Sequence, residues 1–336
     1  MKIAIVILNW NGVDLLKTYL PSVVEHSKDH VIYLADNAST DNSISWTTTT
    51  YPEVKIIAMD KNRGYAGGYN VALKSVQEEV VCLLNSDVAV TAGWCDVIAN
   101  RFLKDKNLSA CQPKILDDKR KGHFEYAGAA GGFLDRYAYP YCRGRIFDTI
   151  EKDLGQYNDS INLHWASGAC LFLRVSSFNK VGGLDEDYFA HQEEIDLCWR
   201  LRHAGYTVSY QPDSVIYHLG GGTLATLNPR KTFYNFRNSL YNIIKNDRSS
   251  SWFWNLFIRM VLDGIAAFKF LAEFKFAHFM AVLKAHFYFY LKLIPLFKKR
   301  KTVKQLVKNN SAQNAQLSIV YQYFIMGRKQ YSNNLK

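Results

Sequence analysis

The chain has 336 residues, 48% of them hydrophobic and 21% charged, so it is too apolar for a disordered protein and long enough for two or three domains. Its net charge of +11 is unevenly spread, because residues 230–336 hold 19 Lys and Arg against three acidic residues, which leaves −5 for residues 1–229. The acidic body argues against nucleic-acid binding, and the basic tail predicts contact with an anionic surface.

The location of the protein is suggested by its cysteines and its apolar runs. The six cysteines form no C-x-x-C pair, which indicates reduced intracellular thiols rather than a disulfide or zinc framework. The first apolar run, 3–8, is too short for a signal peptide, and no charge-free run of 18 apolar residues predicts a transmembrane helix. We expect a cytoplasmic protein attached peripherally to the inner face of the cell membrane.

Short apolar runs alternate with helical patterns in the first half of the chain. The predicted strands are 3–8, 31–35, 54–58 and 80–84, and the predicted helices are 13–26, 41–49, 68–76 and 93–104. This alternation predicts an α/β fold with a mostly parallel sheet and helices on both faces. Ligands of such sheets bind beyond the carboxyl ends of the strands, so the polar residues after each strand should meet in one crevice.

The pattern changes after residue 117. Residues 117–163 are rich in charge, Gly and Tyr, and we interpret them as an insertion or long loop. Order returns with a strand at 164–174, a turn at 182–183, a helix ending near 205, and two short strands at 207–211 and 213–218. A helical tail begins near Pro229, which divides the chain into a body (1–229) and a tail (230–336).

Polar residues follow the first two strands. Asn9 and Asn11 come after the first, and Asp36 ends the second. A carboxylate at a strand end can accept hydrogen bonds from a ribose or a base. Alternatively, this segment only caps the next helix, through one of residues 39–41.

The third strand is followed by a glycine-rich segment, 62–70, that includes Asn62 and Gly64 and opens a helix. Glycines let the backbone approach a ligand closely, and a helix N-terminus favours an anion. The alternative is a tight turn that needs positive φ. No G-x-G-x-x-G follows the first strand, so the dinucleotide-binding fingerprint is absent.

Candidate metal ligands follow the fourth strand and end the last one. Asn85 and Asp87 offer the oxygen ligands that Mg²⁺ and Mn²⁺ prefer, and such a metal could also hold a diphosphate. A helix cap is a poor alternative for Asp87, because the next predicted helix starts six residues later. His218 precedes glycines 220–222 and is a candidate nitrogen ligand, although a lone histidine is more often a packed or surface residue.

Glu193 and Glu194 lie in the most acidic stretch, near the start of a predicted helix. The helix dipole alone accounts for acids there. The functional alternative is a general base, because adjacent carboxylates raise each other's pKa.

The motifs ILNWNG (7–12), DNASTD (36–41), NRGYAGG (62–68), LNSD (84–87), SGA (167–169), EEIDL (193–197) and His218 occur in this order. With them, residues 1–245 resemble bacterial family-2 glycosyltransferases, most of all the rhamnosyltransferase-type members that build O-antigens and capsules. The resemblance implies a GT-A-like fold for residues 1–229 and inverting transfer from a nucleotide-diphosphate sugar to a hydroxyl of a glycan, which we expect to be lipid-linked. It also implies a divalent metal, Mg²⁺ or Mn²⁺.

The same resemblance implies roles for individual residues. The residues that would contact the donor are Asn9, Asn11, Asp36, Asn62, Gly64, Asn85 and Asp87. The metal would bind Asp87 and His218, and Glu194 would be the general base with Glu193 beside it. The acceptor side would include Trp165, Ser167 and Gly168. Two departures from the family pattern stand out. Asn85 replaces the first Asp of D-x-D, and Glu194 stands where Asp is common, which leaves the choice between Glu193 and Glu194 open. The Q-x-x-R-W motif of processive synthases is absent, which favours addition of one or a few sugars.

Two other functions compete with this one. A sugar-nucleotide nucleotidyltransferase should have a Gly-rich, Arg-containing loop directly after the first strand, where this chain has Asn9-Trp10-Asn11-Gly12. A membrane-bound scaffold that has lost catalysis is compatible with Asn85.

The tail is unusually aromatic. Residues 252–297 hold 14 aromatics, and on one unbroken helix Arg259, Asp263, Lys269, Glu273, Lys284 and Lys292 would fall within an arc of about 140°. A wide aromatic face, a narrow charged face and the basic run 298–301 predict a helix lying on an anionic membrane. The alternative is a helix packed on the body or in a homodimer interface.

Overall fold

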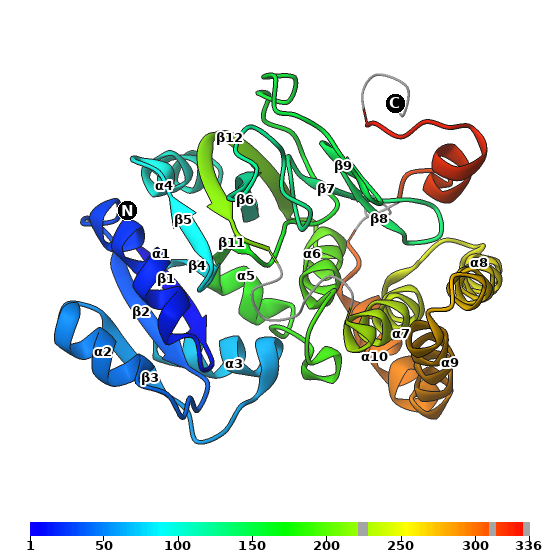
Figure 1. Ribbon diagram of the computed structural model, residues 1–336, viewed down its shortest axis with the longest axis horizontal. Helices are drawn as coiled ribbons and strands as arrows, with labels where there is room; N and C mark the ends of the chain where they lie inside the picture. The colour runs from blue at the N-terminus through cyan, green and yellow to red at the C-terminus, as the bar shows by residue number, and fades with distance from the viewer. Residues whose placement is uncertain (221–227, 309–313, 332–336) are drawn as a thin grey trace.

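The computed structural model describes residues 1–220, 228–308 and 314–331, and within them an eight-stranded main sheet lies between helices, with a four-stranded sheet beside it (Figure 1). The main sheet runs in the order β3 (Lys55–Ala58), β2 (Val31–Asp36), β1 (Ile3–Asn9), β4 (Val80–Asn85), β11 (Cys170–Arg174), β6 (Leu108–Asp117), β12 (Thr207–His218) and β5 (Val88–Val90). The predicted α/β fold is confirmed. The sheet is mixed, because β11 runs antiparallel to β4 and β6, and β5 antiparallel to β12.

Alternate side chains of each strand point to opposite faces of the sheet and form two cores. Ile3 and Ile5 of β1 pack in the core under α1 and α4, whereas Ala4 and Val6 pack with α3 and α6. The helices of the body are α1 (Val13–Glu25), α2 (Ser43–Thr50), α3 (Gly64–Ala72), α4 (Trp94–Lys104), α5 (Val175–Lys180) and α6 (Glu193–His203), with short 3₁₀ turns at Leu73–Ser75 and Glu186–Tyr188. All six cysteines are buried and free.

Four predicted elements differ from the observed ones. The predicted helix 68–76 starts at Gly64, four residues earlier, and ends as a 3₁₀ turn. Only the end of the predicted strand 164–174 is extended, as β11, because the residues before it form a loop. The two predicted strands 207–211 and 213–218 are one strand, β12, whose pairing with β6 is interrupted by an irregularity between Gln211 and Val215.

The segment 117–163 carries the small sheet. Its strands are β7 (Gly132–Leu134), β8 (Pro140–Cys142), β9 (Arg145–Ile146) and β10 (Thr149–Ile150). The C-terminal segment crosses it, with Tyr331 stacked on Phe133 and Tyr141, and it includes a π-helical turn at Tyr321–Ile325. Because its strands are short and joined by tight turns, this sheet contains no long apolar run that would predict it from the sequence.

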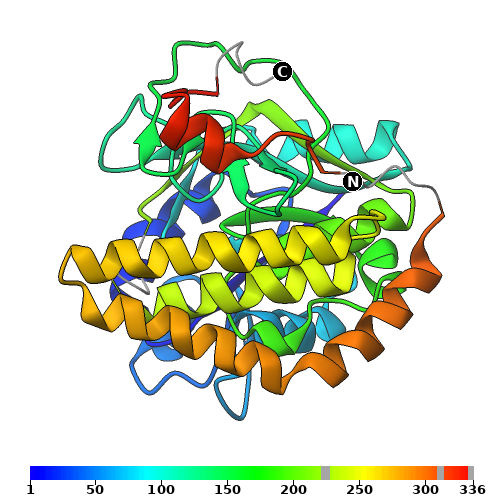
Figure 2. The same ribbon diagram turned by 90° about the vertical axis from the view of Figure 1, so that its right-hand side faces the viewer.

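The tail consists of α7 (Pro229–Asn246), α8 (Trp252–Ala272), α9 (Phe276–Leu291) and α10 (Leu293–Leu306). The first three lie side by side as a layer against the body (Figure 2). The assumption of one unbroken helix is therefore wrong. Phe274 adopts a left-handed φ of 56° and the Lys275 N–H bonds back to Phe270 O at 2.8 Å, which ends α8 and starts the turn into α9.

Within the described residues, no single helix is long and apolar enough to cross a membrane. The pair α9 and α10, bent by 67°, meets that criterion together by length and composition.

Candidate active site

The carboxyl ends of β1 and β2 are joined by a buried network around Asp36. Asn9 Nδ2 donates to Asp36 Oδ2 and to Ser39 Oγ, both at 3.1 Å, and the Ser39 N–H donates to Asp36 Oδ1 at 2.8 Å. Asp36 thus orders this edge of the sheet. Asn9 Oδ1 is buried without a hydrogen-bond partner among the described residues and lies against Gly12, where a Cβ would be 2.5 Å from it.

The ends of β2 and β3 are linked by asparagines. Asn37 Nδ2 donates to Asn62 Oδ1 and Gly64 O, both at 3.1 Å. Asn11 is exposed, and its Oδ1 accepts from the Thr40 N–H at 2.7 Å. The predicted donor residues of the first three strands therefore lie along one polar edge.

The close contact around Gly64 explains the glycine. Its φ is +68°, and a Cβ there would lie 2.7 Å from Phe189 O. The next residue, Tyr65, donates from its N–H to Phe189 O at 3.0 Å and from its hydroxyl to Gly168 O at 2.6 Å. The start of α3 is thereby fixed to the loop before α6 and to the predicted acceptor side.

Asp87 and His218, the predicted metal ligands, lie together. Asp87 is in the turn between β4 and β5, and His218 ends β12, the antiparallel partner of β5. His218 Nε2 is 3.1 Å from Asp87 Oδ1 and 3.5 Å from Asn85 Nδ2. A carboxylate oxygen and an imidazole nitrogen suit Mn²⁺ or Mg²⁺. In residues 1–220, 228–308 and 314–331 no three His, Cys, Asp or Glu side chains are arranged to hold a metal, so other ligands would come from water or a diphosphate.

A third charged group, Glu125 of the insertion, faces the opposite side of the imidazole. Its Oε1 lies 3.4 Å from His218 Nδ1, and both residues are buried. Burial alone would lower the pKa of His218, but the Glu125 and Asp87 carboxylates outweigh it and raise that pKa to about 10. A protonated ring therefore stands where a metal requires a neutral nitrogen.

Glu193 and Glu194 begin α6 as predicted, but their surroundings differ. Glu193 is buried, its Oε2 has no hydrogen-bond partner among the described residues, and burial followed by the Glu194 charge raises its pKa well above the usual value. Glu194 is half-buried, and its Cβ lies 3.8 Å from where a Cβ on Gly168 would stand. Burial raises the pKa of Glu194 to about 7, although backbone N–H groups of the first turn act to lower it. Of the two carboxyl groups, Glu194 is the one that a substrate can reach.

The predicted acceptor-side residues do not share one environment. Trp165 is 2% exposed, and its indole N–H donates to Phe133 O at 2.9 Å, which argues against direct contact with an acceptor. Ser167 is buried as well, with its Oγ accepting from the Ala169 N–H at 3.2 Å. Gly168 is partly exposed between Tyr65 and Glu194.

The metal-ligand pair and Glu194 are connected through segment 167–169. The Asn85 N–H donates to Ala169 O at 3.0 Å, so the end of β4 lies against this segment, while Gly168 adjoins Glu194. The candidate metal ligands and the candidate base therefore flank the same segment, 167–169.

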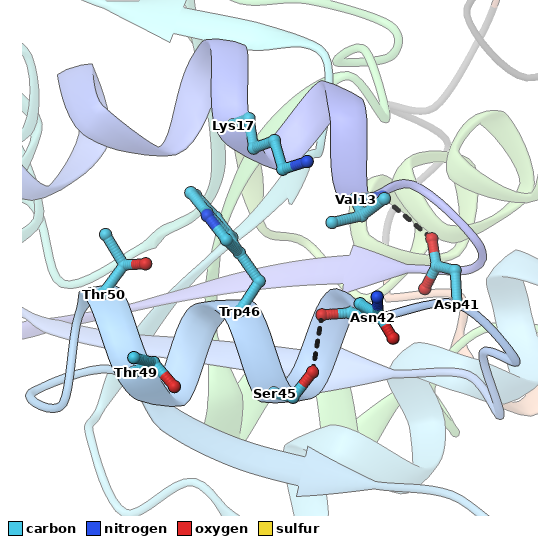
Figure 3. A pocket seen from close by; sticks show the side chains of 8 residues that line it. All are labelled: Val13, Lys17, Asp41, Asn42, Ser45, Trp46, Thr49 and Thr50. Atoms are coloured by element: carbon cyan, nitrogen blue, oxygen red, sulfur yellow. Dashed lines mark hydrogen bonds between the residues drawn. The ribbon is translucent and has the colours of Figure 1, made fainter.

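A shallow hollow lies elsewhere, between α1 and α2 (Figure 3). Its lining comes from these two helices and the turn before α2: Val13, Lys17, Asp41, Asn42, Ser45, Trp46, Thr49 and Thr50. Asp41 accepts from the Val13 N–H at 3.0 Å and from the Ser43 N–H and hydroxyl at 3.0 and 2.6 Å, at the start of α2. The hollow flanks the sheet and is separate from the site around Asp87 and Glu194.

The sequence profile described as Glycosyl transferase family 2 matches residues 4–182, more than half of the chain. The chain belongs to this family. The matched region runs from β1 to α5, so it contains Asp36, Gly64 and Asp87, whereas Glu194 and His218 lie beyond it.

Curated relatives include rhamnosyltransferases. This family-2 chain is 26% identical over 252 residues to the N-acetylglucosaminyl-diphospho-decaprenol L-rhamnosyltransferase of Mycobacterium tuberculosis, an alignment that covers 71% of this chain and 81% of that one. It is 26% identical over 157 residues to Rhamnosyltransferase WbbL of Escherichia coli, covering 44% and 58%. The predicted resemblance to family-2 enzymes of the rhamnosyltransferase type is confirmed.

Solved structures confirm the fold. GalNAc-T7, solved with UDP, GalNAc and Mn²⁺, superposes with a TM-score of 0.55 at 15% identity, covering 72% of this chain and 47% of that one. The mannosyltransferase PcManGT from Pyrobaculum calidifontis, solved with GDP-Man and Mn²⁺, gives 0.53 at 14% identity, covering 87% and 88%. The fold of this glycosyltransferase is GT-A-like.

Two residues of this glycosyltransferase site escaped the sequence analysis. Glu125 lies in the irregular insertion, where no strand end marks it. Tyr65 lies within the glycine-rich segment, but only its hydrogen bond to Gly168 reveals that it spans to another part of the site. Of the glycines 220–222 that follow His218, Gly221 and Gly222 lie outside the described residues.

Proposed function

We propose that the protein transfers a sugar, with inversion at the anomeric carbon, from a nucleotide-diphosphate donor to a hydroxyl of a lipid-linked glycan during cell-surface polysaccharide synthesis. The observation that supports this most is the shared position of the Asp87–His218 pair and Glu194 on either side of segment 167–169. A diphosphate at the former and an acceptor hydroxyl beside the latter is the arrangement that a direct displacement requires.

The donor's nucleoside would bind along the edge formed by β1, β2 and β3. Asp36 already accepts from Asn9 and Ser39, but a carboxylate has further lone pairs for a ribose or base. The exposed side chains of Asn11 and Asn62 flank it, and Gly64 lets the backbone come close.

A divalent cation would be held by Asp87 and His218, with Asn85 in contact with the imidazole. When bound, it supplies positive charge that stabilises the departing diphosphate. The proton on His218 must leave for such binding, and Glu125 is placed to receive the hydrogen bond of the remaining N–H at Nδ1.

Glu194 would take the proton of the attacking hydroxyl. A pKa of about 7 suits a base at neutral pH, because it is deprotonated there and still has affinity for a proton. Glu193, which is more buried and whose pKa is also raised, would remain neutral beside it.

The experiment is a donor screen with the purified full-length protein and MnCl₂. Release of nucleoside diphosphate is measured for UDP-, GDP- and dTDP-linked sugars, with and without a polyprenyl-diphosphate-linked N-acetylglucosamine as acceptor. We expect one donor to be consumed in an acceptor-dependent way and the product linkage to be inverted. A protein that binds nucleotide diphosphate and Mn²⁺ but consumes no donor would favour the scaffold alternative.

We also propose that the tail attaches the protein to an anionic membrane through the aromatic face of α8 and α9. The charged residues Arg259 and Asp263 point inward, where they are 3% and 0% exposed and bond to each other at 2.8 Å. The predicted charged face is therefore wrong for α8. The outer faces of α8 and α9 carry exposed large apolar side chains: Phe253, Trp254, Phe257, Val261, Ile265, Phe268, Phe276, Met280, Leu283, Phe287, Tyr290 and Leu291.

Lysines border this apolar face. Lys269, Lys275 and Lys284 are exposed at the hairpin of α8 and α9. Of the basic run 298–301, Lys299 binds Asp187 at 2.7 Å and Arg300 binds the carbonyl of Asp247 at 2.7 Å, so half of the run is used to hold α10 on the body. An apolar aromatic surface edged by lysines fits the headgroup region of an anionic bilayer, which would also bring the site to a lipid-linked acceptor.

A further inference from the structure

The backbone immediately before Glu193 is unusual. Phe189, His191 and Gln192 all have positive φ, at 64°, 68° and 68°. Residues with side chains rarely adopt this conformation, and it persists only where the surroundings enforce it. This segment, 189–192, decides where α6 starts and hence where the carboxylates of its first turn point.

The surroundings that enforce it come from α7. Asn238 Nδ2, with two N–H groups to donate, lies within hydrogen-bond distance of three carbonyl oxygens of residues 188–191: Tyr188 O at 3.3 Å, Ala190 O at 3.0 Å and His191 O at 2.6 Å. Arg237 adds hydrogen bonds from Nη2 to Asp187 O and Tyr188 O, both at 3.0 Å. Asn238 is fully buried, so without it Ala190 O and His191 O would lose this donor, whereas Tyr188 O would keep its bond from Arg237.

The last residue of the segment is held by its side chain. The buried amide of Gln192 donates from Nε2 to Ser239 Oγ at 2.8 Å and to Asn235 O at 3.1 Å. Its Oε1 accepts from Asn242 Nδ2 at 3.2 Å. These bonds hold a residue that precedes both glutamates directly.

Helix α7 also hydrogen-bonds to the first turn of α6. Asn246 Nδ2 donates to Asp196 Oδ1 at 2.9 Å, and Lys245 Nζ lies 2.8 Å from that oxygen. Helix α7 lies beside α6 in the fold (Figure 1). Although the sequence places it in the tail, α7 fixes the backbone on both sides of Glu193 and Glu194.

We propose that Asn238 and Ser239 are positioning residues, which hold segment 189–192 with the positive φ angles of Phe189, His191 and Gln192 and thereby keep Glu194 beside Gly168. The kinetic consequence rests on the proposed function. We call the hydrogen bonds that Asn238 and Ser239 make to residues 188–192 the clamp. Without the clamp, segment 189–192 relaxes toward ordinary backbone angles and the start of α6 shifts. Asn238 and Ser239 hydrogen-bond to residues 188–192 and, among the described residues, not to β1, β2 or β3, whose link to this segment is the bond from the Tyr65 N–H to Phe189 O. We therefore expect the larger loss in catalysis and the smaller one in donor binding.

The test compares Asn238→Ala and the milder Ser239→Ala with a matched control, Asn255→Ala. Asn255 is a buried amide of the same type, but it bonds to Asp247 at 2.9 Å and to Ser249 at 3.2 Å in the turn before α8. With the donor found in the screen, we expect kcat to fall about 10- to 100-fold in Asn238→Ala, because a displacement of about 1 Å of a catalytic group has such an effect. Donor KM should stay within about threefold, and the control should keep the wild-type kcat even where its melting temperature falls as much.

Three results would overturn the proposal: a wild-type kcat in both clamp variants, an equal loss of kcat in Asn255→Ala, or a loss confined to donor KM. A measurement that does not depend on activity tests the positioning role of Asn238 and Ser239 separately from the proposed function. Amide hydrogen exchange of residues 188–195 should accelerate in Asn238→Ala and Ser239→Ala but not in Asn255→Ala, even if no donor is ever consumed. Unchanged exchange in the clamp variants contradicts the clamp itself.

Discussion

His218 Nε2 lies 3.1 Å from Asp87 Oδ1, although the two residues are 131 positions apart in the chain. The contact arises because β12 pairs antiparallel with β5, which places His218 opposite Val88, the residue after Asp87. The strand pairing therefore assembles the candidate metal site before any metal binds.

Replacing Asp87 with Ala should abolish metal-dependent nucleotide binding, because Asp87 supplies the carboxylate of the predicted ligand pair and His218 supplies only a nitrogen. We expect kcat to fall about 10³-fold, since charge stabilisation by a metal contributes several kcal/mol to such a transfer. Calorimetry with UDP and MnCl₂ measures binding directly. Asp14→Ala, at an exposed carboxylate of α1, is the control, and Mn²⁺-dependent binding that survives in Asp87→Ala contradicts the assignment.

Binding of Mn²⁺ should strengthen as the pH rises. The pKa of His218 is raised to about 10 without metal, so below that value a proton competes for the ring and affinity changes about tenfold per pH unit. Glu125→Gln removes a carboxylate that raises this pKa, and we expect tighter binding at pH 7. Weaker binding in Glu125→Gln would contradict this expectation and mean instead that the Glu125 carboxylate supports the metal, either as a ligand or through its contact with His218 Nδ1.

Glu194→Gln should abolish transfer, whereas Glu193→Gln should retain much of it. The two are distinguished by access, because Glu194 adjoins Gly168 and Glu193 is buried. The pKa of Glu194 is raised to about 7, so the base is protonated and idle below that pH, and kcat should rise as the pH increases through 7. Initial rates between pH 5 and 9 check both points, and near-normal turnover of Glu194→Gln would assign the base elsewhere.

Breaking the buried pair of Arg259 and Asp263 should destabilise the tail. Arg259 also stacks on the ring of Tyr139, 3.8 Å from its centroid, so the pair fastens α8 to the insertion. Arg259→Met alone leaves a buried charge and should cost about 3–5 kcal/mol of unfolding free energy. The double variant Arg259→Met/Asp263→Leu should recover most of that loss in urea titrations. A double variant no more stable than the single one argues against the charge as the cause.

Polar substitutions on the outer face of α8 should weaken membrane binding. Trp254→Ser and Phe268→Ser each remove a side chain that is 61% or 69% exposed, and each should lower the affinity for anionic phospholipid vesicles about tenfold. Leu154→Ser, at an 82% exposed leucine of the insertion, serves as the matched control. If the wild type ignores vesicles but sediments as a dimer that Trp254→Ser dissociates, the face is a homodimer interface.

The sequence by itself determined the parts of the protein that depend on local pattern. Apolar runs such as 3–8 and 80–84 marked the central strands, because a strand buried on both faces is apolar throughout. The polar residues after them, Asp36 and Asp87, marked the edge where ligands bind, because the carboxyl ends of neighbouring parallel strands come together. The charge difference between residues 1–229 and 230–336 likewise predicts a body and a tail, a division that stays a prediction.

The tertiary structure alone decided the features that rest on contacts between distant residues. Glu125 faces His218 because the insertion folds back over the site, and the inward direction of Arg259 depends on its partners Asp263 and Tyr139. The position of Glu194 depends on hydrogen bonds from α7 to a left-handed backbone, which no periodicity encodes. Local sequence specifies which element forms, whereas packing and buried hydrogen bonds between elements specify which groups meet at the site.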